Sequence, residues 1–221
     1  ETTGYEEKNK QGQVIGQLKL EKPVHVLLEG ANLDIYKPLS RNELKYKDLY
    51  NDINSIPEDF AFLFVGHWMQ GNIGEDRKNV GLLIKAFYEM FKNKKKVPAL
   101  ILKTAITNAS NVGRREIQSR IHNIRNSVDG KRLPNVYFIQ GDFSDVEMNE
   151  LYNHPKIKSM VSFTKGEGFG RPLLEFSLTN KPIVASNWSG QKDFLNPEFT
   201  ALVNGTTKPI HKSAQIKNML V

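Results

Sequence analysis

The chain has 221 residues, and its 31 basic and 24 acidic side chains give a formal net charge of +7. A hydrophobic fraction of 39% is enough for a core, whereas no apolar run approaches the roughly 18 residues that a membrane-spanning helix needs. The lack of cysteine excludes disulfides, thiolate metal ligands and cysteine nucleophiles, and it fits a reducing cytosol.

The first part of the chain, residues 1–58, shows little sustained pattern. Residues 1–22 are polar with scattered glycine and glutamine, and we expect them to hold little structure alone. The apolar residues 23–28 predict a short strand, which Glu29-Gly30 ends. Residues 31–58 mix polar and apolar positions without a period, which predicts a linker with one short helix around residues 44–53.

From residue 60 onward, short apolar runs alternate with helical stripes. The runs that predict strands are residues 60–65, 99–102, 136–139, 159–163, 182–186 and 201–203. Helices are predicted at residues 80–91, 117–128 and 146–152, and another begins at Pro172. A last helix is predicted at residues 213–220, and we expect the domain to be clipped there at its C-terminus. This alternation indicates βαβ units. The predicted fold class is α/β, with a Rossmann-like parallel sheet of about six strands flanked by helices.

The positive charge is concentrated in this second part. Residues 1–58 carry 8 basic and 10 acidic side chains, a net charge of −2, whereas residues 59–221 carry 23 and 14, a net charge of +9. Such an excess indicates an anionic partner, and nucleic acid, a phosphorylated ligand and acidic lipid would each satisfy it. No nucleic-acid-binding motif accompanies the charge, so we expect no nucleic-acid partner.

The loop after the fourth predicted strand, residues 164–171, combines features of a ligand site. Three glycines at alternate positions let the backbone approach a ligand, and free N–H groups at the start of the next helix favour an anion. We expect Glu167 to lie in this loop and Glu175 about one turn into the next helix, and carboxylates accept hydrogen bonds from hydroxyl groups. A nucleotide sugar would satisfy both features, because its phosphates would bind the free N–H groups and its hydroxyl groups would donate to the carboxylates. In the alternative reading, the glycines only shape a turn and Glu175 lies on a solvated face.

The run from Glu167 to Glu175, with seven residues between the two glutamates, resembles the E-x7-E signature of retaining GT-B glycosyltransferases of the group 1 type. Residues 26–38 are similar to the interdomain link of that family, and residues 64–66 with 77–83 resemble the first strand and helix of its donor domain. The resemblance covers roughly residues 24–205. It implies that residues 1–58 are a remnant of the N-terminal domain with the linker, and that residues 59–221 are the nucleotide-sugar-binding domain.

The resemblance also implies roles for individual residues. Glu167 would be the catalytic residue that contacts the donor sugar, and Glu175 would contact the nucleotide ribose. His67 stands where the family commonly has arginine, so either Arg77 or His67 binds the phosphates, or the donor site is altered. The implied donor-binding residues are Gly66, His67, Arg77, Lys78, Gln140, Phe143, Gly168, Phe169, Gly170, Leu174 and Glu175.

By resemblance, the chain is the donor domain of a retaining, metal-independent glycosyltransferase of the hexosyltransferase type. The implied partners are a UDP-, GDP- or ADP-sugar as co-substrate, an unknown acceptor and a missing N-terminal domain, with no further cofactor. Without that domain, we expect binding but slow turnover or none. The expected location is cytoplasmic, with the four arginines between residues 114 and 125 either solvated or in weak peripheral contact with membrane lipid.

Two other functions compete with this one. The first is a non-catalytic module that binds a nucleotide sugar or a protein partner. The second is a hydrolase that uses Glu167 and Glu175 as an acid/base pair, which we disfavour because both residues belong to one continuous turn. Trp68 and Trp188 are predicted in loops at the ligand edge of the sheet, where either would border an acceptor sugar or simply pack.

Overall fold

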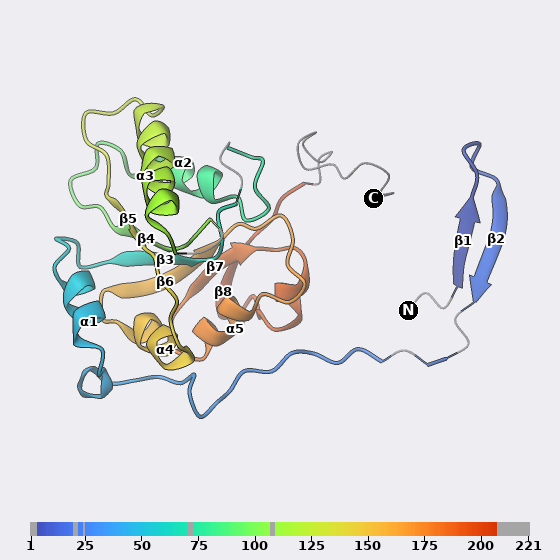
Figure 1. Ribbon diagram of the computed structural model, residues 1–221, viewed down its shortest axis with the longest axis horizontal. Coiled ribbons are helices and arrows are strands. Elements are labelled where there is room, and N and C mark those ends of the chain that lie inside the picture. The colour runs from blue at the N-terminus through green and yellow to red at the C-terminus, as the bar shows by residue number, and fades with distance from the viewer. Residues whose placement is uncertain (1–3, 20–21, 24, 70–72, 107–108, 207–221) are drawn as a thin grey trace. The chain divides into compact units, whose positions relative to one another are not determined.

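The computed structural model describes the chain except for residues 1–3, 20–21, 24, 70–72, 107–108 and 207–221, so the helix predicted at residues 213–220 lies outside the described residues (Figure 1). The chain divides into two compact units, Glu1–Gly30 and Ala31–Val221.

The first unit contains an antiparallel hairpin of β1 (Gly4–Lys8) and β2 (Val14–Lys19). Its turn is held by the Asn9 side chain, whose Oδ1 accepts hydrogen bonds from the backbone N–H groups of Gln11 at 3.0 Å and Gln13 at 2.9 Å. The prediction of little structure in residues 1–22 is therefore wrong for this segment. The cause is local, because an asparagine side chain can replace backbone partners in a tight turn.

The strand predicted at residues 23–28 is also wrong over the described residues. Residues 25–30 have no regular secondary structure, and the side chains of Val26 and Leu27 are 74% and 95% exposed. A strand needs a neighbour for its backbone N–H and C=O groups. In the described part of the chain, no strand pairs with this apolar run.

The second unit is built on a parallel six-stranded sheet, which confirms the predicted α/β fold (Figure 1). Its strand order is β5-β4-β3-β6-β7-β8, so the direction of strand addition reverses between β3 and β6. Ligands in such sheets bind at the carboxyl ends of the strands near this reversal. The strands are β3 (Ala61–Val65), β4 (Ala99–Lys103), β5 (Val136–Ile139), β6 (Ile157–Ser162), β7 (Ile183–Ser186) and β8 (Thr200–Val203).

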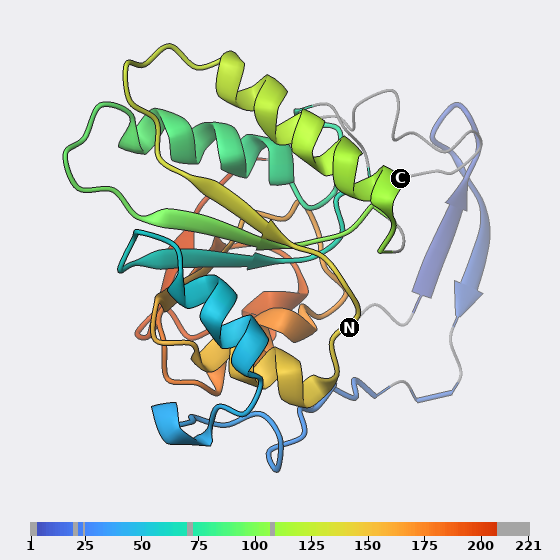
Figure 2. The same ribbon diagram turned by 60° about the vertical axis from the view of Figure 1, so that its left-hand side comes forward.

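Helices cover both faces of this sheet. Figures 1 and 2 show α2 (Val80–Phe91) and α3 (Asn111–Asn126) on one face, and α1 (Lys47–Asn54), α4 (Asp145–Asn153) and α5 (Arg171–Ser177) on the other. Two short 3-10 helices, η1 (Arg41–Glu43) and η2 (Gly190–Asp193), lie in connecting loops. The helix predicted around residues 44–53 corresponds to α1.

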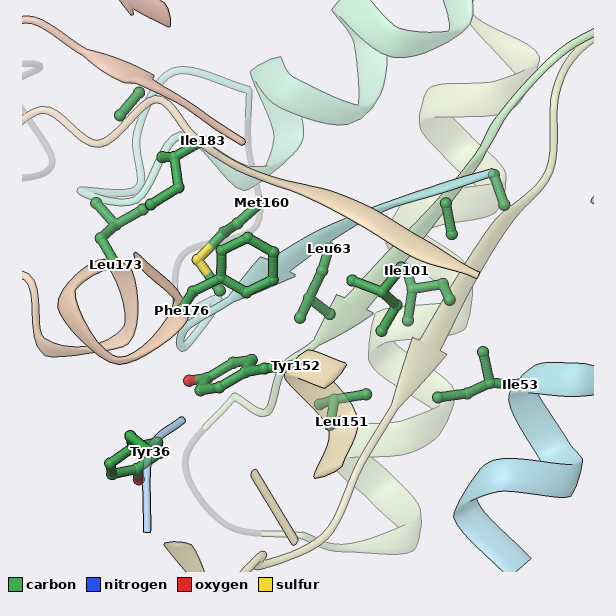
Figure 3. Packing of buried hydrophobic residues seen from close by; sticks show 14 of the residues in the cluster. Tyr36, Ile53, Leu63, Ile101, Leu151, Tyr152, Met160, Leu173, Phe176 and Ile183 are labelled. Atoms are coloured by element: carbon green, nitrogen blue, oxygen red, sulfur yellow. The ribbon is translucent and has the colours of Figure 1, made fainter. Parts of the chain in front are cut away.

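Each face of the sheet has its own hydrophobic core. Successive residues of a strand point to opposite faces, so Leu63 packs among α4 and α5 residues while Phe64 packs against α2 and α3. Figure 3 shows the first of these cores, in which Tyr152 and Phe176 meet nearly edge to face at 5.6 Å between ring centroids. Tyr36 joins the same core, so residues before α1 pack on this unit.

Candidate functional site

The loop between β6 and α5 lies at the reversal of strand order, beside the start of α2. Two contacts fix these segments to each other: the backbone N–H of Lys165 donates to the Arg77 carbonyl at 2.8 Å, and the Asn79 side-chain amide donates to the Phe163 carbonyl at 2.9 Å. They bring Arg77 and Lys78 to the glycine-rich loop, almost ninety residues further along the chain.

Glu167 is the centre of this arrangement. Its carboxylate forms ion pairs with Lys78 Nζ and, at 3.1 Å, with Arg77 Nη1, and only 10% of its side chain is exposed. Burial by itself would raise the pKa of Glu167, but the hydrogen bonds and charges of Lys78 and Arg77 outweigh it and lower the pKa below its ordinary value. Glu167 is therefore ionised at neutral pH and acts only as a hydrogen-bond acceptor.

Glu175 lies on α5 and is 7% exposed, which rules out the alternative that it sits on a solvated face. Tyr152 Oη donates to its Oε2 at 3.0 Å, and Arg171 Nε donates to its Oε1 at 3.3 Å. Burial raises the pKa of Glu175, although both of these partners oppose the shift. The two glutamates of the motif therefore occupy different environments, one held between two cations and one joined to the core through Tyr152.

The glycines of the loop have distinct roles. Gly170 precedes α5 with φ of 98°, a left-handed conformation that favours glycine. A Cβ on Gly168 would meet nothing within 4 Å, so the backbone faces open space there. Gly168 is therefore a place where the chain can approach a ligand closely.

The loop after β7, which was predicted at the ligand edge of the sheet with Trp188, holds the backbone of Glu167 through Ser189, a role that the sequence pattern does not indicate. The Ser189 hydroxyl accepts from the Glu167 N–H at 2.9 Å and donates to the Glu167 carbonyl at 2.7 Å. Gly190 N–H donates to the same carbonyl at 3.2 Å, and a Cβ on Gly190 would lie 2.1 Å from the Gly168 carbonyl oxygen. Gly190 thus permits a backbone contact that any other residue would obstruct.

A cavity of about 260 Å³ opens beside this loop, at the carboxyl ends of β3, β4 and β5. Gly66 connects it to the Glu167 cluster, because a Cβ on Gly66 would lie 3.3 Å from Lys78 Cε. The lining residues are Val65, Gly66, His67, Lys103, Thr104, Ala105, Ala109, Gly141, Asp142, Phe143 and Met148. Gly66, His67 and Phe143 were predicted as donor-binding residues, whereas Lys103 and Thr104 were not.

The remaining predicted residues lie around these two features. Gln140 is not among the cavity residues, and its side-chain amide faces the Ser110 carbonyl at 3.4 Å. Phe169 packs against Phe194 with 5.0 Å between ring centroids, and Leu174 is half-buried on α5. The structure therefore groups Arg77, Lys78 and Glu167, and separately groups Gly66, His67 and Phe143.

The two tryptophans differ in exposure. Trp68 is fully buried, and Arg120 Nη1 donates to its carbonyl at 2.7 Å, so packing is its role. Trp188 is 55% exposed in the loop after β7, so the prediction that it borders an acceptor stays a prediction. The arginines of α3 are partly engaged within the protein, since Arg125 Nη1 donates to the Pro134 carbonyl at 3.0 Å.

Two features are absent from the described part of the chain. Among its residues, no group of three or more His, Asp or Glu side chains is placed to hold a metal ion. Over the same residues, no helix combines the length and the apolar character that crossing a membrane requires.

Comparisons with known proteins agree with this fold. Among solved structures, the C-terminal domain of LpcC, a glycosyl transferase group 1 family protein from Francisella tularensis, has a TM-score of 0.54 at 16% identity, covering 79% of this chain and 80% of that one. Sucrose-phosphate synthase from Thermosynechococcus elongatus has a TM-score of 0.52 at 21% identity, covering 79% of this chain and 38% of its own. The chain therefore spans well under half of that enzyme.

HepE from Anabaena, solved in complex with UDP-glucose, has a TM-score of 0.47 at 17% identity, with 76% of this chain and 39% of that chain covered. No curated protein matches the chain. The family model for glycosyl transferases group 1, however, matches residues 53–220, which include the whole sheet, both carboxylates and the cavity. The chain belongs to the group 1 glycosyl transferase family.

Proposed function

We propose that this donor-binding domain binds a nucleotide-diphosphate sugar and takes part in transfer of the sugar to an acceptor with retention of configuration. The observation that carries the proposal is the cluster of Glu167 with Lys78 and Arg77, next to the open backbone at Gly168. It supplies cations for a diphosphate and an ionised carboxylate for sugar hydroxyls, within one small region at the reversal of strand order.

The chemistry follows from these charges. As the sugar leaves the nucleotide, negative charge develops on the diphosphate, and fixed cations stabilise that charge in the transition state. Lys78, with a half-buried side chain, is already fixed next to Glu167, whereas the Arg77 side chain is more exposed and can turn toward a ligand. We assign the phosphate contact to these two residues, and place the exposed His67 at the border of the cavity.

Glu167 would position the sugar through its hydroxyl groups. Its lowered pKa keeps it ionised at neutral pH, where it can accept hydrogen bonds from sugar hydroxyl groups. Glu175 has both oxygens engaged by Tyr152 and Arg171. For Glu175 to contact the ribose, a ribose hydroxyl must therefore displace Tyr152 or Arg171 from one carboxylate oxygen, or share that oxygen with it. The proposed role of Glu175 includes this rearrangement.

This chain matches only 38% of the length of sucrose-phosphate synthase. We propose that acceptor binding depends on protein outside this chain. We therefore expect nucleotide binding by this chain with slow turnover or none. Full transferase activity of the 221-residue chain would contradict that expectation.

The proposal is tested by calorimetric titration with UDP, GDP and ADP, each with and without an attached glucose. We expect at least one nucleotide to bind, and Glu167→Ala to weaken binding of the nucleotide sugar more than that of the nucleotide. Glu198→Ala is the matched control, because Glu198 is exposed just before the amino end of β8, whereas Glu167 lies at the carboxyl ends of the strands. Binding of none of the six ligands would refute the proposal.

Gly168→Ala provides an independent test of where the donor lies. The added methyl group meets no protein atom, so the free energy of unfolding should stay within about 0.5 kcal/mol of that of the parent chain. If the donor approaches this backbone, the methyl group should still weaken nucleotide-sugar binding. Unchanged nucleotide-sugar binding by a normally folded Gly168→Ala variant would show that the donor does not approach the backbone at Gly168. Normal binding of nucleotides with no effect of Glu167→Ala would favour the non-catalytic module instead.

A further inference from the structure

Lys78, which pairs with Glu167, lies between two residues that are both bound to the end of β6. On one side, the Arg77 carbonyl forms a hydrogen bond of 2.8 Å with the backbone of residues 163–165. On the other side, the Asn79 side-chain amide forms a hydrogen bond of 2.9 Å with a carbonyl of the same segment. The backbone at Lys78 is therefore fixed to the segment that leads directly into the glycine-rich loop.

The backbone of Asn79 has an uncommon conformation. Its φ of 54° and ψ of 32° lie in the left-handed region, which asparagine tolerates better than most residues but glycine adopts most readily. The Asn79 carbonyl also accepts the Leu83 N–H at 2.9 Å, at the start of α2. A glycine at this position could form the same turn, but it could not provide the amide that reaches β6.

The stability of the fold does not by itself account for the Asn79 side chain. Its Oδ1 is buried and has no hydrogen-bond partner among the described residues. A buried acceptor that is left unpaired costs free energy, and unpaired or strained groups are concentrated where function fixes the geometry. The useful part of the side chain is therefore its amide, which donates to the Phe163 carbonyl just beyond the end of β6.

The Lys78 side chain is confined along its length as well as at its backbone. A Cβ on Gly66 would lie 3.3 Å from Lys78 Cε and 3.5 Å from its Cδ, so the aliphatic part passes close to the Gly66 backbone. At the tip, Nζ pairs with Glu167, and only 15% of the side chain is exposed. A shift of the backbone at Lys78 would therefore be transmitted to the ammonium group.

Building on the proposed function, we propose that Asn79 is a positioning residue, whose amide ties the turn at Lys78 to β6 and so holds the Lys78 ammonium beside Glu167 and the donor diphosphate. Asn79 itself need not touch the ligand. An ammonium group has three N–H donors, so Lys78 can serve a phosphate oxygen as well as Glu167. A cation that is fixed before the ligand arrives loses less conformational freedom on binding, which favours affinity.

The decisive variant is Asn79→Gly, which keeps the left-handed turn and removes the amide. Carbon-13 NMR titration of the Glu167 carboxyl group in the ligand-free 221-residue chain gives the first readout, with Glu167→Gln to identify the resonance. Because Lys78 lowers the pKa of Glu167, we expect that pKa to rise toward its ordinary value in Asn79→Gly. A purely structural role for Asn79 would leave it unchanged in the folded variant.

Calorimetric titration with UDP, GDP and ADP gives the second readout. Each nucleotide that binds the parent chain should bind Asn79→Gly about tenfold more weakly, the effect of one well-placed hydrogen bond. Asn79→Ala, which disfavours the turn and also lacks the amide, should lose at least as much affinity and should unfold at a lower temperature.

Asn93→Gly is the matched control. Asn93 is also left-handed, with φ of 60°, and its Oδ1 accepts from the Arg132 N–H at 3.1 Å. This link likewise joins two loops, but it lies before β4 and β5, at the amino ends of the strands. Asn93→Gly should therefore keep the parent values of both the Glu167 pKa and the nucleotide affinity.

The outcomes separate this inference from the proposed function. A folded Asn79→Gly variant with the parent Glu167 pKa, or with the parent nucleotide affinity, would overturn the positioning role and leave the proposed function intact. Equal changes in Asn79→Gly and Asn93→Gly would also overturn it, because the effect would then be a general one. Binding of no nucleotide by the parent chain would refute the proposed function and the phosphate role of Lys78, while the NMR titration would still decide whether Asn79 holds Lys78 beside Glu167.

Discussion

At the scale of single residues, the orientation of Glu167 depends on a serine in a strained conformation. Ser189 has φ of 72° and ψ of −166°, a region that glycine adopts but other residues rarely do. Such conformations persist only where the surroundings enforce them, and here the hydroxyl holds both the N–H and the C=O of Glu167. Strain and hydrogen bonding therefore oppose each other at one position, and substitutions can separate them.

Ser189→Gly removes the strain and the hydroxyl together, whereas Ser189→Ala removes the hydroxyl and keeps the strain. We expect Ser189→Ala to unfold with a free energy about 1–3 kcal/mol lower than that of Ser189→Gly. Both variants should bind the nucleotide sugar more weakly than the parent chain, because Glu167 loses two bonds to its peptide groups. Urea unfolding and calorimetry measure the two effects. A Ser189→Ala variant as stable as Ser189→Gly would show that the backbone there is not strained.

At the scale of secondary structure elements, α4 uses buried polar side chains to hold the extended chain that precedes α1. Glu150 Oε2 accepts from the backbone N–H groups of Lys45 and Tyr46, each at 2.8 Å. Asn153 Oδ1 accepts from the Leu39 N–H at 2.9 Å, and its amide donates to the Lys37 carbonyl at 2.9 Å. These contacts give an irregular segment the backbone partners that a sheet or helix would otherwise provide.

Glu150→Ala leaves the backbone N–H groups of Lys45 and Tyr46 without their acceptor in a partly buried place. We expect the free energy of unfolding to fall by about 2–3 kcal/mol, since each unsatisfied donor costs about 1–3 kcal/mol. Glu150→Gln keeps an oxygen in the same position and should lose less than half as much. Glu198→Ala, at an exposed site, is the control for urea unfolding. Equal losses in Glu150→Ala and Glu150→Gln would contradict the proposed role of the shared oxygen.

His154, at the end of α4, makes the packing of α1 sensitive to acid. Its Nδ1 accepts from the Lys156 N–H at 3.1 Å, and its Nε2 lies 3.2 Å from the Tyr50 carbonyl, so the neutral ring with a proton on Nε2 fits both. Burial, together with the nearby charges of Lys181 and Lys156, lowers the pKa of His154 to about 4, although the bond to Tyr50 opposes the shift.

Because the unfolded chain binds this proton more readily, the stability associated with His154 is complete above about pH 6.5 and falls as the pH drops toward 4. His154→Gln should therefore flatten the fall in unfolding temperature between pH 7 and pH 4.5. His122→Gln, on an exposed face of α3, should leave that fall as it is. The same slope in His154→Gln and the parent chain would assign the acid sensitivity to other groups.

At the scale of the whole molecule, the features that were predictable from sequence are those carried by short stretches. The apolar run at residues 60–65 and the stripe at residues 80–91 each identify an element without reference to the rest of the chain, and together they dictate the α/β class. The glycine loop with Glu167 is likewise contiguous. The contact of Ser189 with Glu167 and the contact of Lys103 with Gly141 could not be predicted. Each pair comes together through the order of the strands in the sheet, which the sequence does not show.

The division of the chain into two units makes a further prediction about the molecule as a whole. Among the described residues, every member of the two hydrophobic cores lies at or after Ala31, and the first buried one is Tyr36. A two-stranded hairpin alone is marginally stable, and the Val26 and Leu27 side chains are exposed. We expect a chain that starts at Ala31 to unfold at the same temperature as the full chain and to bind the same nucleotide with the same affinity.

A chain that starts at Lys47 is the matched comparison, because it also removes Tyr36 and the backbone groups that satisfy Glu150 and Asn153. Its loss of several kcal/mol should lower the unfolding temperature by about 2–4 °C for each kcal/mol in a domain of this size. Calorimetric melting of the three chains therefore locates the boundary of the folding unit. If the chain from Ala31 melted several degrees below the full chain, the hairpin unit would contribute to the stability of the sheet, and the boundary would lie further toward the N-terminus.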